Sequence, residues 1–316
     1  GTSLTKFQGE DAESQGRLLL YRVEHIRVTS GDESYWRPNL INAYEKTYQG
    51  PVSAISHLNT SSNHEYIVVA LGPKIYVYQW EGSFMKPRAF FDGHVYVHTI
   101  RTLKSFIMIA DFERSVQFMQ FNEKNLSLSL IARDFSPLSV YAADFFLNES
   151  QMSILISDAS KNLQIMRIDH SSGGIPLPLR SVADFNLGAH VNAFSSCATM
   201  SESTRFASFF ATLDGSIGVM VPVEERVYKR LERLKLFMCH TLPHNAAMNP
   251  ESFRHYRTPG LPLRNARHSV VDGSVVWRYR LLDTNHQIEF ANSIGSKRER
   301  VLKNLSDVDF DISCFL

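Results

Sequence analysis

Residues 66–78 read YIVVALGPKIYVY: an apolar run, a Gly-Pro turn and a second run in which apolar positions alternate. β-Branched and aromatic residues on both sides of a short turn predict a β-hairpin. The same pattern, with Asp or Gly in the turn, recurs at residues 106–118, 154–165 and 209–219. The continuous first strand of each hairpin should be buried on both faces, and the alternating second strand should have one wetter face.

Each hairpin is preceded by another strand, and each but the last is followed by one. The preceding strands are expected at residues 51–58, 95–103, 138–146 and 190–198, so their starts lie 44, 43 and 52 residues apart. Four strands in about 40–50 residues is the period of a β-propeller blade. A β-sandwich is the rival fold, but its strands should not recur in such regular groups of four.

The repeat predicts an incomplete propeller. Residues 51–188 hold three complete blades, residues 190–223 hold a fourth without its last strand, and residues 16–48 supply half of another. A propeller ring closes with typically 4–8 blades. We therefore expect the chain to be the C-terminal piece of a longer protein whose missing blades lie upstream.

The pattern changes after Pro222. Apolar residues then recur at helical spacing, which predicts an amphipathic helix over residues 224–240. Four shorter helices are expected to start at the N-caps Asn249, Asp272, Thr284 and Ser296, the first of them running to about Tyr256. The predicted fold class is mainly β with an α-helical C-terminal part: a partial β-propeller of four-stranded blades over residues 1–223, then a small helical domain over residues 224–316.

Composition and charge exclude several classes of protein. The 316 residues are 44% hydrophobic and 21% charged, which excludes disordered and collagen-like chains. The net charge of +1 argues against a strongly basic nucleic-acid-binding protein. Residues 224–303, however, hold fifteen Lys/Arg and eight Asp/Glu, so an anionic partner is expected there. The sequence shows no secretory signal and no apolar run near the roughly 18 residues of a membrane helix, which predicts an intracellular, soluble protein without a membrane partner.

Motifs for chemistry are missing from the sequence. The three cysteines, Cys197, Cys239 and Cys314, form no C-x-x-C, so neither a disulfide framework nor a Cys-based zinc site is expected. His240 and His244 flank a proline turn next to Cys239, but a metal site there would need a further ligand. Phosphate-binding glycine loops and nucleophile elbows are absent. We expect no cofactor, no metal and no catalytic residues, and hence not an enzyme; a propeller enzyme, with carboxylates and histidines at its channel, is the alternative.

The basic stretch is the best candidate for a binding surface. Arginine beside aromatic rings can bind phosphates and stack on bases. The alternative is a solvated helix face whose arginine stems pack against protein. The candidate contacts for a partner or for RNA are Arg226, Tyr228, Lys229, Arg230, Arg233 and Arg254. Nucleic acid and an acidic protein segment are both candidate partners.

Four strings carry a resemblance to a known family. They are LGAHVNAF (187–194), FATLDGSIG (210–218), LPHNAAMNP (242–250) and VDG (271–273) followed by Arg278-Tyr279. Together they resemble the C-terminal region of the large-subunit family of the cleavage and polyadenylation specificity factor, which includes the large damaged-DNA-binding subunit and a large subunit of splicing factor 3b. The resemblance leads us to expect a glycine around Ala246-Ala247-Met248. Residues 29–40 match nothing in the family pattern.

The resemblance implies a scaffold of three propellers that ends in a helical domain and works in the nucleus. The polyadenylation member of that family is part of a complex that recognises AAUAAA in pre-mRNA, and it acts as the platform of that complex. The implied partners are a WD-repeat subunit and a zinc-finger subunit that read the signal, the poly(A) polymerase machinery, and pre-mRNA directly or through these subunits. The alternative is a scaffold of the same fold in another nuclear complex, a DNA-damage ubiquitin ligase or a splicing factor.

Overall fold

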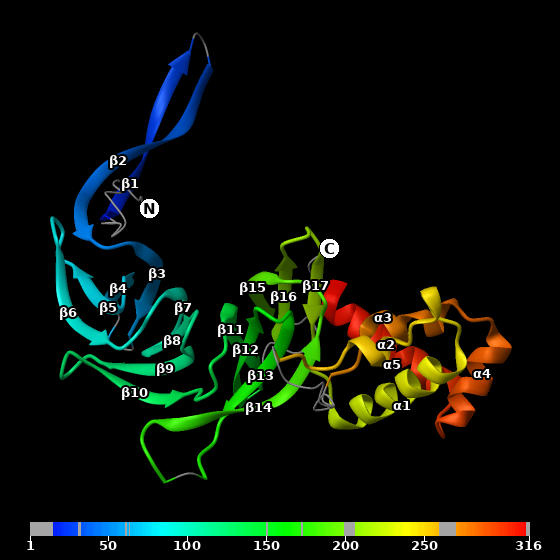
Figure 1. The fold of residues 1–316 in the computed structure, drawn as a ribbon. Helices are drawn as coiled ribbons and strands as arrows, with labels where there is room; N and C mark the ends of the chain where they lie inside the picture. The colour runs from blue at the N-terminus through cyan, green and yellow to red at the C-terminus, as the bar shows by residue number, and fades with distance from the viewer. Residues whose placement is uncertain are drawn as a thin grey trace. The chain divides into compact units, whose positions relative to one another are not determined.

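The computed structural model describes residues 15–30, 33–60, 62, 64–149, 151–171, 173–198, 206–258 and 270–313. The chain divides into two compact units, residues 1–137 and 138–316. Strands make up the described chain as far as Met220, and helices follow from Glu225 (Figure 1). None of the helices in these ranges has both the length and the apolar character needed to cross a bilayer.

The first unit contains a long hairpin and two antiparallel sheets of four strands each. The hairpin consists of β1 (Gln15–Ser30) and β2 (Glu33–Gln49). The first blade consists of β3 (Val52–Asn59), β4 (Glu65–Leu71), β5 (Lys74–Trp80) and β6 (Met85–Asp92). The second blade consists of β7 (Val97–Leu103), β8 (Phe106–Asp111), β9 (Ser115–Asn122) and β10 (Ser127–Arg133). In both sheets each strand pairs with the next one in sequence, as in a propeller blade.

The second unit continues the repeat. The third blade consists of β11 (Val140–Asn148), β12 (Gln151–Asp158), β13 (Asn162–Ile168) and β14 (Leu177–Asn186). The sheet after it has three strands, β15 (Val191–Ala198), β16 (Phe206–Thr212) and β17 (Ile217–Met220). The predicted fold class, an incomplete propeller with a helical C-terminal part, is confirmed.

The hairpin pattern predicted burial correctly for the first strands β4, β8 and β12 but not for β16, where Ala211 is exposed; among the second strands, β5 alternates as expected and β9 does not. Val68, Val69 and Ala70 of β4 are completely buried, so both faces of that strand are covered. In β9, however, every residue from Ser115 to Met119 is also buried. Packing between the blades accounts for one of its faces, because Met119 and Phe121 of β9 pack with Val68 and Ile75 of the first blade.

The core of the first unit lies between its two blades. Val68 and Ile75 of the first blade pack with Ile107, Met119 and Phe121 of the second, and each is at most 2% exposed. Burial of one such side chain contributes about 1.5–3 kcal/mol to stability. The apolar residues of these strands therefore stabilise each blade and also the contact between the two blades.

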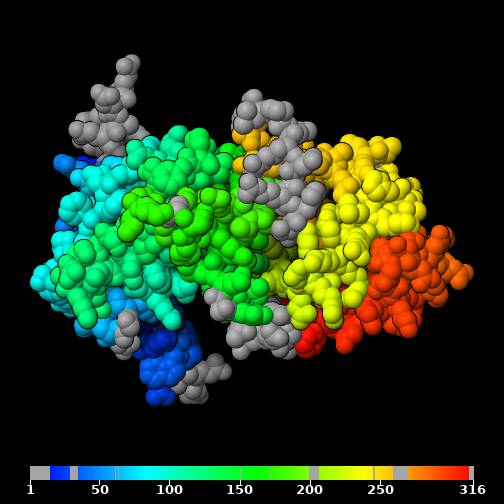
Figure 2. All heavy atoms as spheres, turned by 90° about the horizontal axis from the view of Figure 1, so that it is seen from below, coloured from blue at the N-terminus to red at the C-terminus, as the bar shows by residue number. Residues whose placement is uncertain are grey.

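Helices follow the strands in five α-helical segments and two 3-10 turns within the described residues. They are α1 (Glu225–Thr241), η1 (Asn245–Ala247), α2 (Pro250–Phe253), α3 (Gly273–Val276), η2 (Trp277–Leu281), α4 (Thr284–Ser293) and α5 (Arg298–Ser313). Their shared core contains Leu234, Met238, Tyr279, Phe290 and Leu305. Figure 2 shows α1, in yellow, lying beside the orange and red C-terminal helices.

Two of the four predicted N-caps are confirmed. The side chains of Asn249 and Asp272 accept the N–H of Glu251 (3.0 Å) and of Ser274 (2.9 Å). The helix that Asn249 caps ends at Phe253, before the predicted Tyr256.

The other two predicted caps are wrong by one residue each. Asp283, not Thr284, caps α4, because Asp283 has the extended backbone that lets its carboxylate reach the N–H of Asn285 (3.2 Å). Ser296 does not cap α5, since the N–H of Val301 bonds to the carbonyl of Lys297. The buried hydroxyl oxygen of Ser296 has no hydrogen-bond partner among the described residues.

The turn after α1 explains why a glycine is expected there. Ala246 and Ala247 have φ values of 54° and 56°, in the left-handed region. A Cβ atom in that region costs roughly 1–2 kcal/mol per residue, a penalty that glycine avoids. The two alanines therefore adopt a backbone conformation that their own Cβ atoms disfavour.

Candidate binding surface

Four of the six predicted contact residues line one open groove. Arg226, Lys229, Arg230 and Arg233 of α1 form one wall, and Ile294, Gly295 and Ser296, which follow α4, form the other. Spacings of three and four residues place these cations on one face of the helix. Leu231, Leu234 and Met238 lie on the other face, in the core.

Positive charge along this groove is only partly compensated. Lys229 forms an ion pair with Glu225, and Arg230 donates a hydrogen bond to the side-chain oxygen of Asn304. Arg226 and Arg233 are exposed and form no ion pair with any residue in the described ranges. Burial first, and then repulsion from Arg300 and Arg226, lower the pKa of Arg230. An anion in the groove would relieve that repulsion.

Tyr228 lies on a different face of α1. It is half-buried and borders an apolar hollow that also involves Val219, Leu231 and Trp277. Burial, with a smaller effect of the Glu232 carboxylate, raises the pKa of Tyr228 to about 12. Its ring is thus separated from the groove cations and does not offer a stacking surface beside them.

Arg254 is engaged within the protein. Its Nε donates to Oδ2 of Asp272 (2.9 Å), and its Nη1 donates to the backbone carbonyls of Asn186 (3.2 Å) and Leu187 (2.7 Å). The guanidinium carbon lies 4.8 Å from the centroid of the Phe185 ring. We call this set the Arg254 joint, because it fastens α2 and the start of α3 to the end of β14.

A second set of bonds joins the helical segment to the third blade. The side chain of Asn162 donates to the carbonyl of Arg257 (2.7 Å), and its oxygen accepts the N–H of Arg257 (3.0 Å). Nε2 of Gln164 lies 3.1 Å from the hydroxyl of Tyr256. Asn162 has no local signal in the sequence, because its backbone partner lies 95 residues further along the chain.

Cysteines and histidines form no metal site in the described part of the chain, where no group of three His, Cys, Asp or Glu could hold an ion. Nε2 of His244 instead lies 2.7 Å from the carbonyl oxygen of Cys239. Burial raises the pKa of the Cys239 thiol to about 11, which keeps it protonated and unreactive. Cys197 and Cys239 are free thiols, and Cys314 lies outside the described residues.

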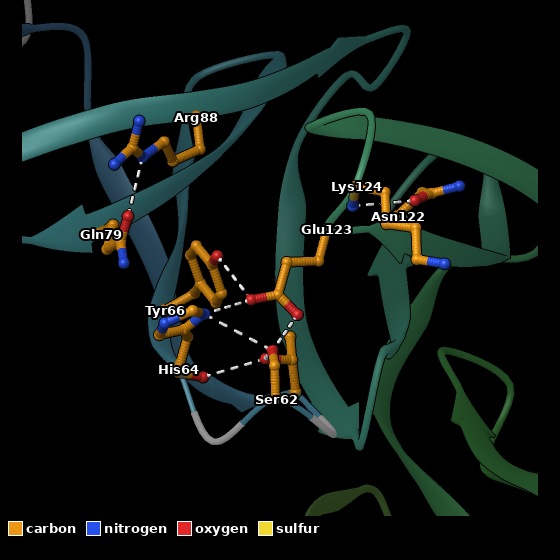
Figure 3. A network of polar contacts seen from close by, with 9 residues as sticks. Ser62, His64, Tyr66, Gln79, Arg88, Asn122, Glu123 and Lys124 are labelled. Carbon is orange, nitrogen blue, oxygen red and sulfur yellow. Dashed lines mark hydrogen bonds and ion pairs between the residues drawn. The ribbon is translucent and has the colours of Figure 1, made fainter.

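Ser62, His64, Tyr66 and Glu123 form a polar cluster that resembles a catalytic triad in composition only (Figure 3). We call it the Glu123 cluster. Nδ1 of His64 lies 2.5 Å from the Glu123 carboxylate, which also accepts bonds from the hydroxyls of Ser62 and Tyr66. Hydrogen bonds, from Ser62 first and then His64, lower the pKa of Glu123 to about 2.

The geometry of this cluster differs from that of a nucleophilic triad. In a triad the serine and the carboxylate bond to opposite nitrogens of the histidine. Here Ser62 and Glu123 bond to each other and both approach Nδ1 of His64. The cluster links the β3–β4 turn to the β9–β10 turn, so its role in the structure is to join the first and second blades.

Comparison with known proteins places the chain in a family. The family model for the CPSF A subunit region matches residues 1–281. The chain belongs to the CPSF A subunit family. This confirms the resemblance drawn from the sequence.

Among relatives in this family, cleavage and polyadenylation specificity factor subunit 1 of Arabidopsis thaliana is 34% identical over 97% of the chain. The protein of the same name from Drosophila melanogaster is 31% identical over 97% of the chain. Protein cft1 of Aspergillus oryzae is 26% identical over 94%. The aligned region is 21%, 21% and 22% of these three proteins, so the chain spans about a fifth of the relatives it matches.

Proposed function

We propose that this chain is a non-catalytic scaffold in nuclear pre-mRNA 3′-end cleavage and polyadenylation. The observation that carries the proposal is the alignment of almost the whole chain with proteins named cleavage and polyadenylation specificity factor subunit 1. Residues 1–223 would act as part of a propeller, and residues 224–316 as a helical domain attached to it.

The way the parts are fastened supports a scaffold role. Propeller blades present broad, rigid faces on which partners can dock through a few buried anchors. The Arg254 joint and the Asn162 contacts hold the helical segment against the third blade with part-buried hydrogen bonds, one of them between charged groups. A partner bound to the helices would therefore keep a fixed position relative to that blade.

The proposed partners are the WD-repeat and zinc-finger subunits that read AAUAAA, together with the poly(A) polymerase machinery. Pre-mRNA would be contacted directly or through these subunits. The proposed contact surface on this chain is the groove formed by Arg226, Lys229, Arg230 and Arg233, with Tyr228 on the neighbouring face of α1. For Arg254 we propose a structural role, because its guanidinium is bonded inside the chain.

Depletion and add-back in a nuclear extract test this proposal. Extract depleted of the full-length protein should lose cleavage of an AAUAAA substrate, and the added protein should restore it; a substrate carrying AAGAAA is the control. Full cleavage after depletion would overturn the proposal. Loss of splicing or of damage-dependent ubiquitination, with cleavage intact, would instead favour a scaffold of the same fold in one of those complexes.

A further inference from the structure

The cationic groove continues into an apolar one along α1. Beyond Arg233, the wall formed by α1 consists of Leu236, Phe237 and His240, and the opposite wall is again Ile294 and Gly295. Arg233, Ile294 and Gly295 belong to both parts, so the two parts form one continuous channel. We call it the α1–α4 groove; one half is positively charged and the other half is apolar.

The dimensions of the groove limit what can fill it. From Arg226 to His240, α1 rises by about 21 Å at roughly 1.5 Å per residue. An extended chain of about six or seven residues covers that distance at about 3.3 Å each. A short extended segment is therefore enough to contact both halves.

The chemistry of the two halves favours protein over RNA. Binding of single-stranded RNA relies on exposed aromatic rings on which bases stack, in addition to cations. Among the residues that the structure describes, no aromatic ring lines the cationic half, because Tyr228 borders the apolar hollow instead. Two rings of the described chain line the apolar half: Phe237 is half-buried and packs edge-to-face with Phe290 at 5.0 Å, and His240 lies at the end of the groove, seven residues after Arg233. Glu224 and Glu225 lie at one end of the groove, so an anionic ligand of either kind would contact the cations beyond them.

We propose that the α1–α4 groove binds an acidic protein segment that carries an apolar side chain at one end. Its carboxylates lie along Arg226, Arg230 and Arg233, and its apolar side chain lies over Leu236 and Ile294. Charge complementarity selects the acidic part of the segment, and the apolar half of the groove sets the direction in which the segment lies. This inference deepens the proposed function, since it names the chemistry of the partner that the scaffold holds at α1.

Binding of labelled peptides to the full-length protein tests the inference. The probe is an extended peptide with three glutamates followed by leucine and phenylalanine; a second peptide has glutamine in place of each glutamate. A uridine oligomer of similar length is the third probe. Affinity is measured by fluorescence anisotropy across a salt series, because exposed charge attraction is screened within about 10 Å at 0.1 M salt.

Variants at exposed positions separate binding from folding. R226E/R233E should lower the affinity for the acidic peptide at least about tenfold, since two attractions become repulsions. Leu236→Gln, at a half-buried position outside the helical core cluster, should lower the affinity for the acidic peptide about threefold. K161E/K303E, a matched double reversal at exposed lysines outside the groove, should leave the affinity unchanged. Circular dichroism of each variant checks that α1 is still folded.

The expected result is binding of the acidic peptide alone, weaker at high salt and sensitive to both groove variants. The inference is overturned if the peptide does not bind, or if R226E/R233E and K161E/K303E bind it equally. Tighter binding of the uridine oligomer, lost in R226E/R233E, would overturn it in favour of RNA. Each result is independent of the depletion test, which measures whether the full-length protein takes part in cleavage at all.

Discussion

Arginines of the helical segment occur in two contrasting settings. At the Arg254 joint, the guanidinium meets a carboxylate, two carbonyls and an aromatic ring. In the α1–α4 groove, Arg226 and Arg233 meet no acidic partner in the described ranges. A satisfied cation stabilises the fold, whereas an exposed and unsatisfied one is available to an anion from outside. The contrast teaches that the partners around a cation, and not its place in a basic stretch, separate a structural role from a binding role.

The largest expected loss of stability follows from a substitution at the Arg254 joint. Arg254→Ala leaves the carboxylate of Asp272, whose side chain is 8% exposed, without its cation. Breaking a buried pair of this kind costs about 3 kcal/mol, reduced somewhat here because Arg254 is 23% exposed. Hydrogen exchange should accelerate in residues 183–190 and 270–282, which reports the local free energy of opening.

The control for this change is Arg254→Lys, which keeps the charge but not the forked geometry. It should recover only part of the protection, because an ammonium group cannot reach the carboxylate and both carbonyls at once. Exchange rates in Arg254→Ala equal to those of the wild type would contradict a structural role for this residue.

The next largest effect is a pH dependence of the free energy of unfolding that comes from His94. This residue is a third kind of basic group, because it is buried and uncharged. Burial, opposed by the nearby Asp111 carboxylate, lowers the pKa of His94 from 6.5 to about 4, and neither ring nitrogen has a hydrogen-bond partner among the described residues. Between those pH values the unfolded chain binds more protons than the folded chain. The contribution to stability is therefore complete above about pH 6.5 and is lost as the pH falls to 4, by at most about 3 kcal/mol.

Unfolding of the wild type and of His94→Gln in urea at several pH values measures this contribution. The free energy of unfolding of the wild type should fall relative to that of the variant as the pH is lowered through this window. Parallel curves for the two proteins would show that His94 does not titrate in this way.

A smaller and opposite effect is expected at the turn after α1. Ala246→Gly removes a Cβ from a residue with φ of 54°, but it also adds freedom to the unfolded chain. The net result should be a stabilisation of about 0.5–1 kcal/mol, seen in the midpoint of thermal unfolding. Asn292→Gly, at an exposed position within α4, should have the opposite sign; destabilisation by both changes would contradict the account of the turn.

The smallest change in stability is expected at Arg233 in the α1–α4 groove. Arg233→Ala removes an exposed side chain that forms no ion pair in the described chain. The free energy of unfolding should change by less than about 0.5 kcal/mol, within the range of ordinary surface substitutions. A loss as large as that of Arg254→Ala would mean that the groove cations are structural too.

Much of the fold follows from the sequence, because strands and turns are specified locally. The apolar runs around Gly72 and Asp214-Gly215 predicted their hairpins, and the period of four strands predicted the blades. The helix starts at Asn249 and Asp272 were right, because each side chain accepts the N–H two residues on. Where two neighbours could compete, as at Asp283 and Thr284, the backbone angle decides, and the sequence does not reveal it.

The candidate site was predictable only in part. The basic stretch predicted Arg226, Arg230 and Arg233 as candidate contacts, and the structure places these three along one groove. The roles of Arg254 and Glu123 were not predictable, because their partners come from distant strands and turns: Asn186 is 68 residues from Arg254, and Ser62 is 61 residues from Glu123. Long-range partners of this kind become visible only when the sheets are assembled.

Purification of the full-length tagged protein from nuclear extract, followed by quantitative mass spectrometry, tests the scaffold role most directly. The account predicts that the WD-repeat and zinc-finger subunits of the polyadenylation complex are recovered in amounts matching the tagged chain. Recovery of ubiquitin-ligase or splicing subunits in their place would contradict it.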